Sequence, residues 1–255
     1  MMRRAVARSF GLAPQHRDCL MLTLVFNTTD EHGGVALYRD LECLAAVANA
    51  STTSYSISLF QMVADLLRQA NLGLSDVELF AVANGPGSFT GIRVGVAAAQ
   101  AWGTAFSRPV LGVSVLEAMV EEAEPATRLA APISDARRGE FFVSLFERAN
   151  ATGAFSPRGE ALLLKGAAAA CFMQEASTTG NAAPTLTCIA REHDEAALSL
   201  RDQAPDFAWR TLAGPLLHGI ARVALRSRER GTWQSPAELD AVYIRRTDAE
   251  MKWRE

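Results

Sequence analysis

The sequence GPGSFTGIRVG at residues 85–95 joins an apolar run at 79–83 to a helical pattern at about 92–106. A run that is apolar on both faces is typical of a central strand, so the motif is predicted to be a strand-to-helix turn. Unpaired backbone N–H groups and the helix dipole favour an anion at such a helix start. Gly85 and Gly87 permit approaches that a side chain would block. Ser88 and Thr90 could cap the helix or hydrogen-bond a phosphate.

Two well-known phosphate motifs do not fit this turn. No Lys-Ser or Lys-Thr pair follows the glycines, as a Walker loop requires, and the spacing is not that of a GxGxxG dinucleotide turn. A Gly-rich turn that only reverses the chain therefore stays open as the alternative.

The helix after the turn has a face made of small residues. A helix interior keeps glycine at a cost of about 1 kcal/mol relative to alanine, so this face predicts close packing against another backbone. Packing within the same domain and packing against a partner protein both stay open. The small residues are Gly91, Gly95, Ala98, Ala99 and Gly103.

The residues before the motif predict an antiparallel hairpin followed by a helix. Strands are expected at 22–26, 35–38 and 42–48, with a turn at 31–34. Apolar residues at helical spacing from Ile57 to Ala70 predict an amphipathic helix that ends near 71–73. A doubly wound nucleotide fold would open with a βαβ unit instead. This order is the one expected of the ribonuclease-H-like half of an actin-type fold.

The residues after the motif predict a second half of the same α/β class. A strand at 110–113 and a helix beginning after Ser114 follow the motif, and strands at 129–133 and 140–146 flank a charged turn. A helix is expected at about 212–228 and an extended tail at 240–246. The Ala-rich residues 148–203 have no clear pattern, so they receive no assignment.

Composition argues against a protein that binds nucleic acid without a partner or crosses a membrane. The net charge is −3, from 25 basic and 28 acidic residues, whereas an autonomous RNA binder is usually basic. No apolar run reaches the roughly 18 residues of a membrane helix, and the four cysteines lack zinc spacing. Residues 1–20 are interpreted as a disordered extension, with a basic RNA-binding arm as the alternative.

The motif and four further segments, in the same order, resemble the TsaB family, which is similar to the glycoprotease-like paralogue TsaD. The four segments are LVFNTTDEHGGVAL, PVLGVSVLEAM, PISDARRGEFFVSLF and LDAVYIRRTDAEMKW. The resemblance implies an α/β, actin/Hsp70-like (ASKHA, ribonuclease-H-like) two-lobed fold. The expected first lobe is 21–113, joined by the helix near 212–230, the second lobe is 114–211, and 231–255 form a tail.

The resemblance also implies a function, and the scattered cysteines, with no apolar signal core near the start, predict a cytoplasmic location. The expected role is a non-catalytic subunit that dimerises with and activates TsaD in N6-threonylcarbamoylation of adenosine 37 in tRNAs that read ANN codons. The ATPase TsaE is the expected third component, a homodimer is the alternative assembly, and tRNA is met only through the complex. No cofactor is expected to be required, although weak ATP or ADP binding at the partner interface is compatible with the family.

The catalytic and metal-binding residues of the active paralogue are not expected here. Its metal-binding HxxxH pair has no counterpart among the four histidines of this chain. Asn27 stands where the family usually has an aspartate, and an amide is a poorer magnesium ligand than a carboxylate. The residues predicted to line a remnant anion or nucleotide loop are Asn27, Thr28, Gly85, Gly87, Ser88, Thr90 and Arg93.

A partner interface is predicted on a face formed by the two helices of the first lobe. Bulky replacements of Gly95 or Ala99 are expected to abolish the complex and leave the monomer folded. The predicted interface residues are Ile57, Phe60, Ala64, Leu67, Gly91, Gly95, Ala98, Ala99 and Trp102.

The charged turn Asp135, Arg137, Arg138 and Glu140 is either a solvated hairpin tip or a contact to the partner lobe or a nucleotide. The competing functions are an actin-like phosphotransferase, which would need magnesium-binding carboxylates, and a glycoprotease-like metalloenzyme, which would need a ligand set such as HExxH.

Overall fold

The computed structural model of the chain describes residues 20–49, 53–150, 153–177, 186–203 and 207–245. The expected N-terminal extension therefore lies outside the described residues, apart from Leu20. The final part of the expected tail, from residue 246 onward, lies outside them too.

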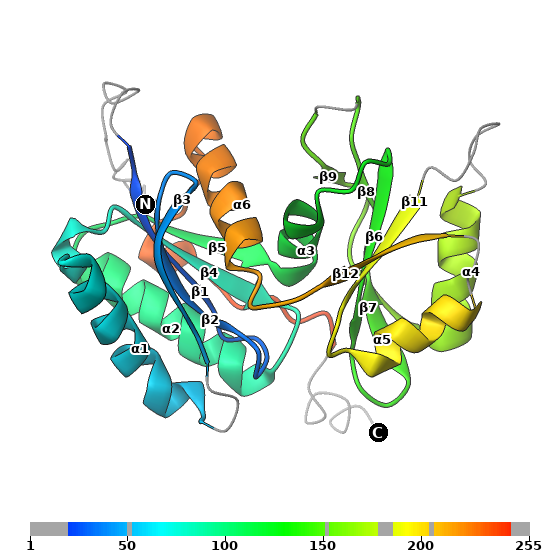
Figure 1. Cartoon of the computed structure of the whole chain (residues 1–255), viewed down its shortest axis with the longest axis horizontal. Coiled ribbons are helices and arrows are strands. Elements are labelled where there is room, and N and C mark those ends of the chain that lie inside the picture. Colours follow the sequence, from blue (N-terminus) through cyan, green and yellow to red (C-terminus); the bar gives the residue numbers. More distant parts are fainter. Residues whose placement is uncertain (1–19, 50–52, 151–152, 178–185, 204–206, 246–255) are drawn as a thin grey trace, which may run out of the picture.

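The first lobe is built on a five-stranded sheet with the strand order β3-β2-β1-β4-β5. β1, β2 and β3 are antiparallel, whereas β4 and β5 run parallel to β1. Helices α1 and α2 cover one face of this sheet (Figure 1). The elements are β1 (Leu22–Asn27), β2 (Gly34–Arg39), β3 (Glu42–Ala48), α1 (Tyr55–Ala70), the 3-10 turn Leu74–Asp76, β4 (Leu79–Gly85), α2 (Phe89–Ala105) and β5 (Val110–Ser114).

Both faces of this sheet are covered, so β1 and β4 are buried at every position, and most of their residues are apolar. Leu24 and Phe26 of β1 pack with α1 and α2, while Val25 packs on the other side. There the cover is α3 (Val115–Ala123) and α6 (Leu217–Arg230), which lie between the two sheets (Figure 1). The expected start of the last helix at 212 is wrong, because Gly214 and Pro215 separate the preceding strand from α6.

The second lobe is built on a seven-stranded sheet whose main order is β10-β7-β6-β11-β12, with β8 paired to β6 and β9 to β8. α4 and α5 cover its outer face (Figure 1). Part of it comes from the region that had no sequence assignment. The elements are β6 (Leu129–Asp135), β7 (Glu140–Val143), β8 (Phe146–Glu147), β9 (Ser156–Pro157), β10 (Leu162–Lys165), α4 (Gly166–Ser177), β11 (Leu186–Arg191), α5 (Glu195–Ser199), the 3-10 turn Leu200–Gln203 and β12 (Ala208–Leu212).

These two sheets with a shared helical layer confirm the α/β, actin/Hsp70-like two-lobed fold. After α6, the chain returns to the first lobe through the 3-10 turn Pro236–Glu238 and then runs toward the second lobe as residues 239–245 (Figure 1). We call residues 239–245 the tail segment. Among the described residues, no helix is both long and apolar enough to cross a membrane.

Candidate functional site

The motif at 85–95 packs against the residues that follow β1. A Cβ added at Gly91 would lie 1.9 Å from the carbonyl oxygen of Thr28, and one at Gly95 would lie 2.4 Å from Thr28 Oγ1. The Thr28 hydroxyl donates a 2.7 Å hydrogen bond to the Gly91 carbonyl. The glycines therefore let α2 approach the end of β1.

This packing decides between the two interpretations of the small-residue face in favour of packing within the lobe. Assignment of these residues to a partner interface is wrong, because the chain's own sheet and helices already bury them. The same holds for Leu67, which faces the core from α1. The buried residues concerned are Leu67, Gly91, Gly95, Ala98, Ala99 and Trp102.

Three other predicted interface residues are exposed on α1. Ile57 is 73% exposed and Phe60 is 55% exposed, with Ala64 exposed as well. The core-facing stripe of α1 consists instead of Tyr55, Leu59, Met62, Val63, Leu66 and Leu67. The Phe60 ring rests edge-on against Trp102 of α2, with centroids 5.6 Å apart. We call Ile57, Phe60 and Ala64 the α1 face.

Asn27 is fully buried and its amide is used within the protein. Its Oδ1 accepts hydrogen bonds from Thr29 N (3.0 Å) and Thr29 Oγ1 (2.7 Å), and its Nδ2 donates to the Pro215 carbonyl (3.1 Å). Its prediction as an anion or nucleotide ligand is therefore contradicted, because the side chain is fully buried and both of its polar atoms have partners within the protein. Asn27 instead ties the first lobe to the segment before α6.

The tail segment covers Gly85, so this glycine does not face an open anion site. A Cβ there would lie 2.4 Å from the Val242 carbonyl oxygen. Val242 N donates to the Asn84 carbonyl (2.8 Å), and Asn84 Nδ2 donates to the Asp240 carbonyl (3.0 Å). The tail segment thus packs on Gly85, and the role of this glycine in an anion loop stays a prediction.

A pocket of about 250 Å³ lies beside the motif, between the starts of α1 and α2. Of the predicted loop residues, Thr28, Ser88 and Thr90 line it, whereas Gly87 does not. Ser88 Oγ caps α2 by accepting from Gly91 N at 3.3 Å. The remaining lining residues are Asp30, Glu31, Asn49, Thr53, Ser54, Tyr55, Gly91 and Val94.

The charges of this pocket do not suit a phosphate well. Two helix starts and several hydroxyl groups favour an anion, but the acidic residues Asp30 and Glu31 line the same pocket, and Asp30 is paired with Arg191. Like charges at close range oppose binding. The pocket is therefore polar without being an evident phosphate site.

Arg93 does not reach the pocket. Its guanidinium lies 3.7 Å from the centroid of the Phe89 ring, and its Nε donates to the Tyr243 hydroxyl at 3.0 Å. Its prediction as an anion-loop residue is contradicted, because the aromatic pair Phe89 and Tyr243 holds it on the outer surface.

The charged turn between β6 and β7 lies outside the pocket as well. Asp135 Oδ1 accepts from Arg137 N (2.7 Å), and the Glu140 carboxylate pairs with Arg245 of the tail segment. Arg137 and Arg138 both have positive φ angles, 67° and 61°. The turn thus contacts the chain's own tail, and the Arg137 side chain remains 87% exposed.

Arg191 links the two lobes. Its side chain is only 3% exposed, with Nη1 3.1 Å from Asp30 Oδ2, and Nη2 donates to the Gly214 carbonyl at 2.6 Å. Sequence reasoning missed it, because it lies in the unassigned region and its partner is 161 positions away. Phe89 and Tyr243 were missed too, although aromatic residues in turn-like stretches are a usable signal.

We expect Arg191→Met to destabilise the chain by about 2 kcal/mol, because it removes a buried cation and leaves Asp30 without its partner. Urea unfolding followed by circular dichroism would measure the change. Arg201→Met, at an exposed arginine, is the control and should shift stability by less than about 0.5 kcal/mol. Equal stabilities for the two variants would contradict a structural role for the Arg191–Asp30 pair.

Beside the Arg191–Asp30 pair, the rings of His32 and His193 lie in contact, with centroids 3.8 Å apart. Burial, followed by the charge of Arg191, lowers the pKa of His193. The unfolded chain then binds the proton at higher pH than the folded chain does. Stability from this group is complete above its ordinary pKa of 6.5 and declines as the pH falls below that value.

We therefore expect the free energy of unfolding to fall from pH 7 to pH 5.5, and His193→Gln to flatten that dependence. Urea unfolding at several pH values would measure it. His218→Gln, outside this contact, serves as the matched control. A His193→Gln profile as steep as that of the wild type would contradict the assignment.

Among the described residues, no group of three or more His, Cys, Asp or Glu side chains is placed to hold a metal ion. The described part of the site is thus a packed junction of β1, α2 and the tail segment, with one polar pocket and one exposed apolar face.

A protein-family model described as TsaD, tRNA N6-adenosine threonylcarbamoyltransferase, matches residues 47–199. The TsaB protein of Bacillus subtilis (strain 168) is 31% identical over 130 residues, which cover 51% of this chain and 57% of that protein. The TsaB protein of Escherichia coli (strain K12) is 34% identical over 131 residues, covering 50% and 56%. Both carry the description "tRNA threonylcarbamoyladenosine biosynthesis protein". The chain spans just over half the length of these relatives.

Among solved structures, a Pseudomonas aeruginosa protein described as similar to peptidase YeaZ has the same fold. The TM-score is 0.71 at 23% identity, covering 89% of this chain and all of that one. A second structure, YeaZ from Pseudomonas aeruginosa, gives 0.69 at 22% identity, covering 88% and all of that chain.

Proposed function

The chain belongs to the TsaD family of tRNA N6-adenosine threonylcarbamoyltransferases, among its TsaB/YeaZ members, and from this we infer a role in threonylcarbamoyladenosine biosynthesis on tRNA. The finer proposal is a non-catalytic subunit that binds and activates a TsaD-type catalytic subunit. The product of the catalytic subunit would be threonylcarbamoyladenosine at position 37 of tRNAs that read ANN codons. A TsaE-type ATPase is proposed as the third component, and the site of action is the cytoplasm.

The observation that carries this proposal is the α1 face. A side chain such as Ile57, exposed beside Phe60 on one helix, is typical of a protein–protein contact surface. α1 and α2 lie side by side over the same face of the first sheet (Figure 1). A matching helix pair on the partner would complete a four-helix packing. A second copy of this chain, forming a homodimer, is the alternative occupant.

The site chemistry agrees with a non-catalytic role. Asn27 supplies an internal hydrogen-bond junction where a magnesium-dependent phosphotransferase would present a carboxylate. Asp30 is engaged by Arg191, and the polar pocket has carboxylates where a phosphate would need cations. We propose that no cofactor is required, and that any ATP or ADP binding is weak and depends on the partner.

The test is reconstitution with the TsaD-type and TsaE-type proteins of the same organism. We expect the chain to co-purify with the TsaD-type subunit and threonylcarbamoylation of tRNA to require it. ATP turnover and metal content of the isolated chain should both be negligible. Robust turnover by the chain alone would favour the phosphotransferase, and stoichiometric bound metal with peptidase activity would favour the metalloenzyme.

A further inference from the structure

A strip of basic and aromatic side chains crosses from the first lobe to the second, and the proposed subunit contact does not use it. It joins the start of α2, the tail segment and the turn between β6 and β7. We call the following six residues the RNA strip: Phe89, Arg93, Tyr243, Arg245, Arg137 and Arg138.

The first-lobe end of the strip is an aromatic pair with an arginine laid on it. Phe89 and Tyr243 are both exposed, and their ring centroids lie 5.2 Å apart. Arg93 lies over the Phe89 ring and is fixed by its bond to the Tyr243 hydroxyl. Exposed rings and guanidinium planes are the surfaces on which unpaired bases stack.

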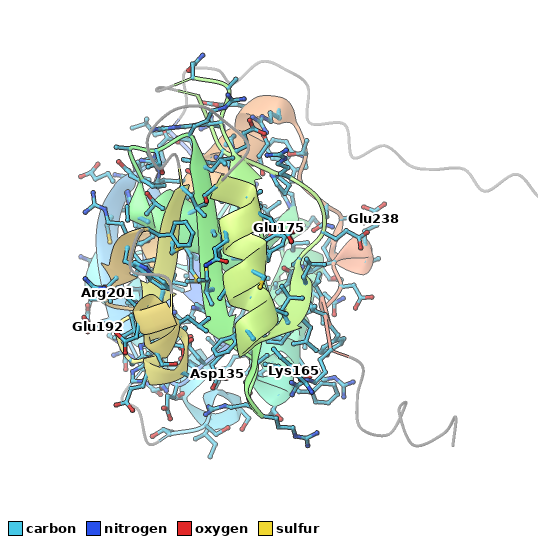
Figure 2. The ribbon with its side chains drawn as sticks, turned by 90° about the vertical axis from the view of Figure 1, so that its right-hand side faces the viewer. Asp135, Lys165, Glu175, Glu192, Arg201 and Glu238 are labelled. Atoms are coloured by element: carbon cyan, nitrogen blue, oxygen red, sulfur yellow. The ribbon has the colours of Figure 1, made fainter. Side chains whose placement is uncertain are left out.

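The second-lobe end of the strip is cationic. Arg245 pairs with Glu140 and reaches the Arg137 carbonyl, with Nη2 at 3.3 Å. Lys165 of β10 stands opposite Glu140 in the strand register, so a further cation extends this end. Figure 2 shows Lys165 and Asp135 at the same end of the second sheet. Arg137 Nη1 lies 3.8 Å from Asp135 Oδ2, and Arg245 pairs with Glu140, so the basic side chains at this end outnumber the two carboxylates beside them.

The backbone of the turn holds both arginines at the tip of the hairpin between β6 and β7. Arg137 and Arg138 occupy consecutive left-handed conformations that disfavour any residue with a Cβ, and that asparagine or glycine would adopt more easily. Consecutive left-handed residues are typical of the tight turn of an antiparallel hairpin such as that of β6 and β7, and the turn projects its side chains away from the sheet. The Arg137 side chain is 87% exposed, so its charge is accessible to a ligand.

We propose that the RNA strip binds an RNA strand, with Arg137, Arg138 and Arg245 on phosphates and the Phe89–Tyr243 pair under an unpaired base. The proposal rests on the proposed function, because tRNA is the RNA that the complex would handle. It assigns the chain a direct contact with the substrate, which its overall net charge of −3 does not suggest. The paired aromatic rings favour RNA over an acidic protein as the ligand. An acidic protein would be bound by the arginines alone, whereas the bases of RNA also use a stacking surface.

The test measures tRNA binding by the complex of this chain with its TsaD-type partner, by fluorescence anisotropy between 50 and 200 mM KCl. Asparagine tolerates left-handed backbone, so Arg137→Asn with Arg138→Asn removes the charges without straining the turn. We expect this double variant to lose about tenfold in affinity. We also expect the slope of log K against log salt to become shallower by about 1.4, for two single-strand phosphate contacts. Tyr243→Ala should weaken binding with little change in slope, because stacking is not electrostatic.

The matched control is Arg201→Asn, at an exposed arginine that Figure 2 shows on the opposite side from Lys165. It should leave affinity and slope unchanged, and the double variant should melt at or above the wild-type temperature. Wild-type affinity and slope in the double variant would overturn the proposal. Loss of the subunit complex in that variant would also overturn it and assign the strip to a protein contact.

The proposed function can fail separately. If the wild-type chain forms no complex, the full chain alone is titrated with the same tRNA. Salt-dependent binding that the double variant loses and Arg201→Asn keeps would then support the strip. No salt-dependent binding by the wild-type chain would overturn it.

Discussion

Replacing Gly91 with valine is expected to destabilise the chain by about 4 kcal/mol or more, which is enough to unfold many domains of this size. The Cβ alone would lie 1.9 Å from the Thr28 carbonyl oxygen, and that atom belongs to backbone that cannot turn aside. The displaced helix would also lose the bond from the Thr28 hydroxyl to the Gly91 carbonyl. Urea unfolding, or the yield of folded protein where the variant does not fold, would measure the effect.

The matched control is Ala97→Val, an exposed position on the same helix. It lowers helix propensity, whereas Gly91→Val raises it, and the exposed side chain is not pressed against β1, so we expect a loss below about 1 kcal/mol. The comparison of Gly91→Val with Ala97→Val also bears on the prediction that bulky replacements at Gly95 or Ala99 break only the complex. Those positions are buried in the chain's own lobe, so loss of the complex there should follow loss of the fold. A stable, monomeric Gly91→Val variant would contradict the packing described for α2.

The double change Ile57→Glu and Phe60→Glu is expected to weaken binding to the TsaD-type partner at least 100-fold. Truncation of a central interface residue commonly costs 2 kcal/mol or more, and a buried carboxylate adds a desolvation penalty. Every 1.4 kcal/mol is a factor of ten in affinity. The fold should survive, because Ile57 is 73% exposed and Phe60 is 55% exposed, with its ring edge-on to Trp102. Isothermal titration and a thermal melt would measure the two effects separately.

Gln69→Glu, near the other end of α1, adds one negative charge to the same helix at an exposed position and should bind like the wild type. Unchanged affinity in the double variant would remove the α1 face from the interface. The homodimer alternative predicts a different readout: the double variant would shift the isolated chain from dimer to monomer in sedimentation, with or without the TsaD-type subunit.

Local pattern was enough to predict the first lobe. The two-faced apolar strand at 79–83, the antiparallel hairpin before it and the Gly-rich turn after it each left a clear signal, and β4, β1, β2 and α2 lie where those signals placed them. The second lobe was harder to predict because short strands such as β8 and β9 have two residues each, too few to show any period.

Pattern could not decide which side of a helix faces inward. α1 carries Leu59 and Met62 on one side and Ile57 and Phe60 on another, so periodicity alone mixed the core stripe with the exposed face. The same limit applies to α2, where small residues predict a close neighbour without saying which one. Long-range pairs such as Arg191 with Asp30 leave no local trace, because each residue is ordinary in its own surroundings.

The tail segment has a consequence for how the chain is made. Val242 donates to the Asn84 carbonyl, and its own carbonyl lies over Gly85, so the turn after β4 is completed by residues about 155 positions further on. α6, which covers the inner face of the first sheet, is also encoded late. During synthesis the first lobe must therefore wait, with the inner face of its sheet only partly covered by α3, until α6 and the tail segment have left the ribosome. Such long sequence separation slows folding and exposes apolar surface meanwhile, so the lobe that is translated first is the one that is finished last.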